Sequence, residues 1–184
     1  LEPGETVGAL IVNAGTAGIY GIFLDGSGTF EHYSPQALEG NPVLTNFVTY
    51  GGAIYFCDSQ GNLYGLDANF DPLPGLPTTF VGSTLNSTGI TVVGDENDQA
   101  VVIAGDIMGD TLCFYSTATG NLLTLPTNQT AITALSDVTH EGIVYAGGST
   151  TNSLGQVFAI RASDVYVGGF FTSLHSAQGP RLGV

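Results

Sequence analysis

The side chains of this chain that could do acid–base chemistry are aspartates beside glycine-bearing turns. Asp58, Asp67, Asp106 and Asp110 flank hairpin turns. A buried carboxyl group has a raised pKa and can act as a general acid. Asp is also an ordinary turn-forming residue, because its side chain accepts hydrogen bonds from the backbone that follows it. The pattern favours turns, and it leaves Asp58 and Asp106 as the catalytic candidates.

The densest group of oxygen ligands is the run Asp95-Glu96-Asn97-Asp98. Oxygen atoms at alternate loop positions, here those of Asp95 and Asn97, are the kind of ligand that Ca²⁺ takes. The run lacks the glycine of a calcium-binding loop, so it favours a solvated turn over a metal site. The three histidines are scattered, without the spacing of a metal site or a catalytic triad: His32, His140 and His175.

Cysteines and glycosylation sequons bear on the compartment in which the chain works. Cys57 and Cys113 each lie within an apolar run. One disulfide and two buried free thiols are both open interpretations, and the pattern favours the thiols. Asn86 and Asn128 each begin an Asn-X-Ser/Thr sequon, which makes them glycosylation candidates in a secreting host.

The composition points to a place outside the cytosol. Of 184 residues, 43% are hydrophobic and only 10% are charged, and the formal net charge is −14. The chain has no lysine and two arginines, Arg161 and Arg181. Such a surface suits a secreted protein, a virion component or an acidic medium. Nucleic acid is excluded as a partner because phosphate binding needs basic side chains. No apolar run approaches the ~20 residues of a membrane-spanning helix.

Two series of apolar runs recur along the chain. The first series lies at 9–12, 53–56, 100–103 and 142–145, with starts separated by 44, 47 and 42 residues. The second lies at 19–22, 63–66, 112–115 and 157–160, with starts separated by 44, 49 and 45 residues. Two series that keep one period indicate a duplicated structural unit.

The repeat predicts an all-β fold. Each pair of runs, joined by a polar or Gly-bearing turn, predicts an antiparallel hairpin. We expect a further strand before the hairpin at 46–50, 89–93 and 132–138, and another after it at 29–33, 121–125 and 165–171. Four short strands in about 45 residues are typical of a β-propeller blade. The chain is therefore predicted to be one domain, 1–184, of about four blades, with copies at 6–45, 46–88, 89–131 and 132–175. A two-sheet β-sandwich is the alternative.

The segment 52–67 resembles the blade repeat of quinoprotein-type β-propellers. It has an apolar strand, a short Asp/Gly turn, and then Tyr64-Gly65-Leu66-Asp67. The segment 142–162 repeats this pattern more weakly, with Arg161 in the position of Asp67. The resemblance implies a propeller fold. It does not imply a quinone cofactor, because the chain lacks tryptophan, vicinal cysteines and the basic residues that would hold an anionic quinone.

Four blades are few for a propeller, and three ways of completing the ring are open. The segment 176–184 could supply a closing strand, two chains could pair as half-rings, or the chain could belong to a longer protein. We expect self-association or a larger assembly.

Three functions remain open from the sequence. The first is an extracellular or particle-surface module for binding or assembly, without cofactor or catalytic site. The second is an acid-adapted secreted hydrolase, since tetrathionate hydrolases of acidophiles are similar in fold to quinoprotein propellers. The third is a structural subunit of a filament or virion.

Overall fold

The structure is a computed structural model that describes residues 9–24, 27–33, 43–80, 89–94, 100–106, 111–127, 130–137, 142–150 and 155–161. Within these ranges the chain is all-β, with fourteen strands, one short 3₁₀ helix (η1, Gly15–Ala17) and no α-helix. The strands form four antiparallel sheets, which we name A to D in chain order. The prediction of an all-β fold is confirmed.

Each sheet is a meander in which strands that follow one another in sequence lie side by side. Sheet A contains β1 (Ala9–Asn13), β2 (Ile19–Phe23) and β3 (Phe30–Tyr33). Sheet B contains β4 (Leu44–Tyr50), β5 (Ala53–Asp58), β6 (Asn62–Leu66) and β7 (Thr78–Thr79). Sheet C contains β8 (Ile90–Gly94), β9 (Ala100–Asp106), β10 (Thr111–Ser116) and β11 (Leu122–Pro126). Sheet D contains β12 (Thr130–Leu135), β13 (Ile143–Thr150) and β14 (Gly155–Arg161).

The four hairpins predicted from the paired runs are confirmed as β1–β2, β5–β6, β9–β10 and β13–β14. The strands expected before three of the hairpins are β4, β8 and β12, and those expected after two of them are β3 and β11. The segments 165–171 and 176–184 lie outside the described residues. The two-sheet sandwich does not describe this arrangement, because the strands form four separate sheets.

In the first series of apolar runs, the Cα pairing shifts sheets C and D by one residue relative to sheets A and B, whereas the second series keeps its alignment. Cα pairing places Ile11 opposite Gly21 and Tyr55 opposite Gly65. In sheets C and D the residues at the same hairpin position are Ile103, opposite Phe114, and Tyr145, opposite Ala159. The starts of the apolar runs, at 53, 100 and 142, instead align Val102 and Val144 with Tyr55. A shift of one residue exchanges the two faces of a strand, so it decides which side chains of each sheet face the next.

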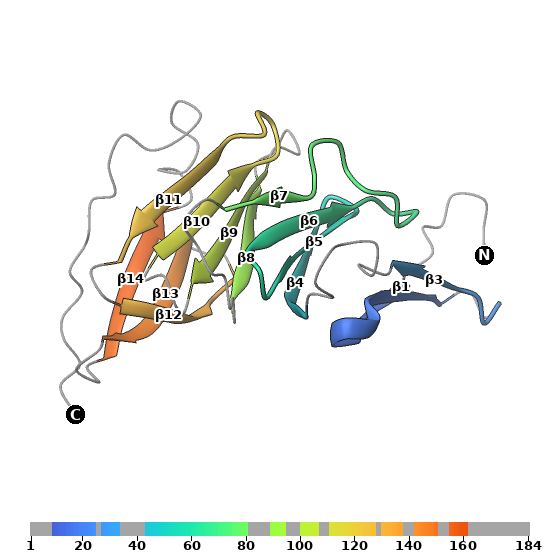
Figure 1. Ribbon diagram of the computed structural model, residues 1–184, viewed down its shortest axis with the longest axis horizontal. Helices are drawn as coiled ribbons and strands as arrows, with labels where there is room; N and C mark the ends of the chain where they lie inside the picture. The colour runs from blue at the N-terminus through green and yellow to red at the C-terminus, as the bar shows by residue number, and fades with distance from the viewer. Residues whose placement is uncertain are drawn as a thin grey trace.

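The sheets form a row in chain order, A–B–C–D, with an apolar cluster at each junction (Figure 1). Ile19 of sheet A packs with Ile54 and Phe56 of sheet B. Tyr55 and Leu63, on the other face of sheet B, pack with Val102 of sheet C. The opposite face of sheet C packs on sheet D in the third cluster, which contains Ile103, Leu112, Phe114, Val144, Ala146 and Ile160. Sheets B and C are therefore covered on both faces.

At two of these junctions, an aromatic ring of one sheet lies directly against a glycine of the next. A Cβ atom on Gly21 of β2 would lie 2.3 Å from Cζ of Phe70, the aromatic side chain that sheet B places against sheet A. A Cβ atom on Gly94 of β8 would lie 1.7 Å from Cζ of Tyr50, which crosses from β4. Both distances are shorter than real side-chain contacts, so a side chain at either position would displace an aromatic ring.

Candidate functional site

Asp58, the catalytic candidate of sheet B, lies at the end of β5 and is completely buried. Its Oδ1 accepts hydrogen bonds from the backbone N–H groups of Gln60 (2.8 Å) and Asn62 (2.9 Å). Its Oδ2 accepts from the Asn62 side-chain amide and from the Tyr64 hydroxyl, both at 2.8 Å. These four donors hold the carboxylate inside the β5–β6 turn, so its chemistry here is that of a buried turn residue.

Tyr64 completes this buried group. Burial and the hydrogen bond to Asp58 raise the pKa of Tyr64 above its ordinary value of 10.0. Its ring stacks on Phe56 with centroids 4.9 Å apart and an interplanar angle of 3°. Aromatic stacking and a satisfied hydroxyl fix the ring at the A–B junction. The sequence analysis did not predict that Tyr64 contacts Asp58. The Asp-x₅-Tyr spacing could have indicated it, because a tight hairpin brings these two positions together.

Asp67 repeats this turn chemistry at a more exposed position. Its Oδ1 accepts hydrogen bonds from the backbone N–H groups of Asn69 (2.8 Å) and Asp71 (3.0 Å). Asp106, the second catalytic candidate, is the last residue of β9, and its backbone pairs with Thr111. The structure places Asp58 in sheet B and Asp106 in sheet C, so the two do not share a turn.

Several sequence candidates lie outside the described residues: Asp95, Asn97, Asp110, Asn86, Asn128, His140 and His175. Of the histidines, the structure describes His32, whose ring stacks on Tyr20 with centroids 4.1 Å apart. Among the residues that the structure describes, no group of three His, Cys, Asp or Glu side chains could hold a metal ion. In the same part of the chain, no helix has the length and apolar character needed to cross a membrane.

Cys57 and Cys113 are both buried, and they form no disulfide with each other. They belong to one cluster at the B–C junction, to which β5 contributes Cys57 and β10 contributes Cys113. Burial, together with the neighbouring Cys113 thiol, raises the pKa of the Cys57 thiol. A buried thiol that resists ionisation is a packing residue rather than a nucleophile.

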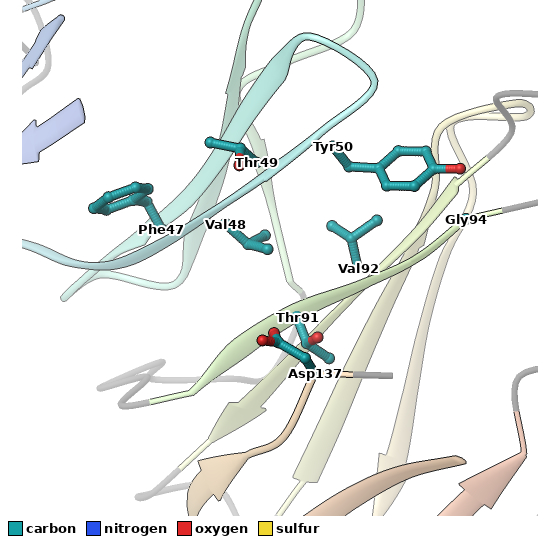
Figure 2. A pocket seen from close by; sticks show the side chains of 8 residues that line it. All are labelled: Phe47, Val48, Thr49, Tyr50, Thr91, Val92, Gly94 and Asp137. Carbon is teal, nitrogen blue, oxygen red and sulfur yellow. The ribbon is translucent and has the colours of Figure 1, made fainter. Parts of the chain in front are cut away.

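A cleft of about 530 Å³ opens between sheets B and C. β4 lines one side with Phe47, Val48, Thr49 and Tyr50, and β8 lines the other with Thr91, Val92 and Gly94. Figure 2 shows Thr91 beside Asp137 at one end of the cleft and Tyr50 reaching over β8 at the other. Of the lining residues, only Asp137 and Tyr50 carry titratable groups, so the lining offers no pair of carboxylates for general acid–base catalysis.

The two ends of the row carry exposed apolar faces. On sheet A, the side chains that alternate away from sheet B form the N-terminal end face, which contains Leu10, Val12, Tyr20 and Ile22, with His32 stacked on Tyr20. On sheet D, the side chains that alternate away from sheet C form the C-terminal end face, which contains Ile143, Tyr145, Val157 and Ala159 and, at its edge, Arg161. Leu10 is 53% exposed and Val157 is 55% exposed. Sequence reasoning missed these faces because the runs that form them are apolar on both sides.

Comparison with known proteins finds similarity in structure alone. No protein-family model and no curated protein sequence matches this chain. The fold is similar to that of the computationally designed Ika4 protein, with a TM-score of 0.57 and 14% identity over 87% of this chain and 95% of that one. It is also similar to BBS1N, crystallised in complex with ARL6DN, with a TM-score of 0.52 and 12% identity. That match covers 85% of this chain and 51% of BBS1N. At these identities the similarity concerns the fold.

Proposed function

We propose that the chain is a non-catalytic module for binding and assembly outside the cytosol, and that its four sheets are the blades of a β-propeller. Sheets A, B and C turn equivalent hairpin positions toward the sheet that follows, as blades related by a rotation do. Ile11, Tyr55 and Ile103 occupy one such position, and Tyr145 occupies it in sheet D.

The observation that carries the proposal is the contrast between inner and outer sheets. The inner sheets are covered on both faces, whereas the outermost faces of sheets A and D expose large apolar side chains. Contiguous exposed apolar surface of this kind marks sites of protein association. The hydrogen bonds of Asp58 add to this, because they commit the best catalytic candidate to a turn.

A location outside the cytosol follows from the composition rather than from any single site. The chain carries two basic and sixteen acidic residues, so it offers little to nucleic acid or to an anionic membrane surface. A surface rich in Thr, Ser, Asn and Gly suits a secreted or particle-surface protein.

The proposal is tested by native mass measurement and light scattering from nanomolar to high micromolar concentration, with parallel assays of hydrolysis from acidic to neutral pH. We expect concentration-dependent assembly and no turnover. A protein that stays monomeric over the whole range contradicts the assembly role. Turnover by the wild-type chain contradicts the non-catalytic role, and its loss in Asp106→Asn, or in Asp58→Asn under conditions where that variant is folded, favours the hydrolase.

A further inference from the structure

We propose that two copies of this chain close into one ring of eight sheets. The C-terminal end face of each copy packs on the N-terminal end face of the other. This inference rests on the proposed assembly function and adds to it the partner, the stoichiometry and the surfaces. The partner is a second copy of the chain, and the two contacts are related by a two-fold axis.

The first argument comes from the hairpin position of Val157. The residues at that position in sheets A, B and C are Ile19, Leu63 and Leu112, with exposures of 0%, 0% and 1%. Each of them is buried against the sheet that follows. Val157 occupies the same position in sheet D and is 55% exposed, because the described residues supply no following sheet.

The second argument comes from the hairpin position of Leu10, on the opposite side of the blade. The residues at that position in sheets B, C and D are Ile54, Val102 and Val144, with exposures of 4%, 0% and 0%. Each is buried against the sheet that precedes it. Leu10 is 53% exposed in sheet A.

These two positions meet at every junction of the row. Ile19 and Ile54 belong to the A–B cluster, Leu63 and Val102 to the B–C cluster, and Leu112 and Val144 to the C–D cluster. Val157 and Leu10 are the remaining pair of the series. A contact between sheet D and sheet A therefore continues an interface that the molecule already uses three times.

A second pair of positions follows the same rule. Ile22 of sheet A is 39% exposed, whereas Leu66, Tyr115 and Ile160 at its position in the other sheets are 1%, 4% and 2% exposed. Tyr145 of sheet D is 40% exposed, and its equivalent Tyr55 is 5% exposed. Both end faces thus have the composition of faces that are buried elsewhere in the molecule.

The position of the end faces selects a second copy rather than the same chain as the occupant. Sheets A and D lie at opposite ends of the long axis of the molecule (Figure 1). Closing one chain on itself would require the three buried junctions between them to rearrange, whereas a second copy can bridge the gap with all three intact.

Charge is compatible with this contact. Two chains of net charge −14 repel each other, so a self-association surface must keep carboxylates away. The described residues of the two end faces include no acidic side chain, and the one charged residue among them is the cation Arg161, on the C-terminal end face.

The test uses the full chain with two single substitutions, Leu10→Glu and Val157→Lys. Both side chains are already half exposed, so the substitutions leave the fold of the separate chain in place. Each variant buries unpaired charge in the proposed contact and should raise the dimer dissociation constant by about 100-fold or more. Val43→Glu is the matched control, because Val43 is 46% exposed but lies on neither end face.

Mixing the two variants gives the decisive measurement. In a mixed dimer, one contact places the introduced glutamate against the introduced lysine, and the other contact keeps the original Leu10 and Val157. The mixed dimer should therefore form where neither variant alone dimerises. Native mass spectrometry of a 1:1 mixture, with one variant isotope-labelled, reads this directly. A mixed dimer in the mixture, with a dimeric wild type and a dimeric Val43→Glu control, is the expected result.

Other outcomes overturn the inference in distinguishable ways. A wild-type chain that is monomeric at every concentration contradicts both this inference and the proposed assembly function. Wild-type assembly that persists in Leu10→Glu and Val157→Lys contradicts the end-face contact alone. Loss of assembly without rescue in the mixture contradicts the pairing of Leu10 with Val157, and assemblies larger than a dimer show an open array in place of a ring.

Discussion

The hydroxyl of Tyr64 donates a 2.8 Å hydrogen bond to Oδ2 of Asp58 across the β5–β6 hairpin, with both side chains buried. The bond links the turn of sheet B to the aromatic stack at the A–B junction. Asp58, a catalytic candidate in the sequence, therefore has a structural role. Replacing it should lower the free energy of unfolding.

Replacing Asp58 with Asn should destabilise the fold by about 2–4 kcal/mol, because an amide group cannot accept all four hydrogen bonds and leaves buried donors unpaired. Urea unfolding followed by tyrosine fluorescence gives the free energy of unfolding. Asp67→Asn is the matched control, since that carboxylate is partly exposed and accepts two hydrogen bonds. It should cost about 1 kcal/mol or less. Equal losses in the two variants would contradict the buried role of Asp58.

The stability of the chain should fall in alkaline solution through Tyr64. Its pKa is raised in the folded state above 10.0, its ordinary value in an unfolded chain. The folded state therefore holds its proton where the unfolded state releases it. The stabilising contribution is complete below about pH 10 and declines as the pH rises above that value. Urea midpoints measured from neutral to strongly alkaline pH should show this decline, and Tyr64→Phe should reduce its slope. An unchanged slope in Tyr64→Phe would assign the decline to other groups.

The two cysteines should resist thiol reagents in the native protein. Burial raises the pKa of Cys57 and keeps reagent away from both thiols. In mildly alkaline buffer we expect labelling by a chromogenic disulfide to be at least about 100-fold slower than in urea, where both thiols react. Labelling of the native protein at the rate of the unfolded one would contradict the B–C packing. Fewer than two reactive thiols per chain in urea would reveal a disulfide.

Gly21→Ala should loosen sheet A from sheet B. The added Cβ meets the Phe70 ring, and overpacking of this kind costs about 1–3 kcal/mol. Hydrogen exchange should lose protection in β1 to β3 while sheets C and D keep theirs. Gly147→Ala in β13 is the control, because no atom lies within 4 Å of the added Cβ. Uniform loss of protection over all four sheets would show that the junctions unfold together.

The hairpin strands of this fold could be predicted from the sequence, because each is a short apolar run beside a turn. The side of the sheet on which each strand residue lies could not be predicted. Val102 and Ile103 are adjacent and equally apolar, and only the pairing with β10 shows that they lie on opposite sides of sheet C. The two-residue strand β7 is too short to leave a periodic signal.

The same limit applies to the sites. The Asp-Gly turn predicted that Asp58 would lie at a hairpin, but its burial depends on Tyr64 and on the neighbouring sheet. The end faces escaped prediction because Leu10 and Val157 look like core residues, as their equivalents in the other sheets are. Exposure depends on which sheets have a neighbour, and a repeat period does not encode that.

The meander order of the sheets has a consequence for how the chain is made. Every strand pairs with one that is close in sequence, and each sheet packs on the one before it. Contacts of low sequence separation form early, so each sheet can fold as it leaves the ribosome and serve as the template for the next. Of the four sheets, sheet A is then complete while sheet D is still being translated, so the exposed apolar side chains of sheet A, Leu10 among them, leave the ribosome before those of sheet D.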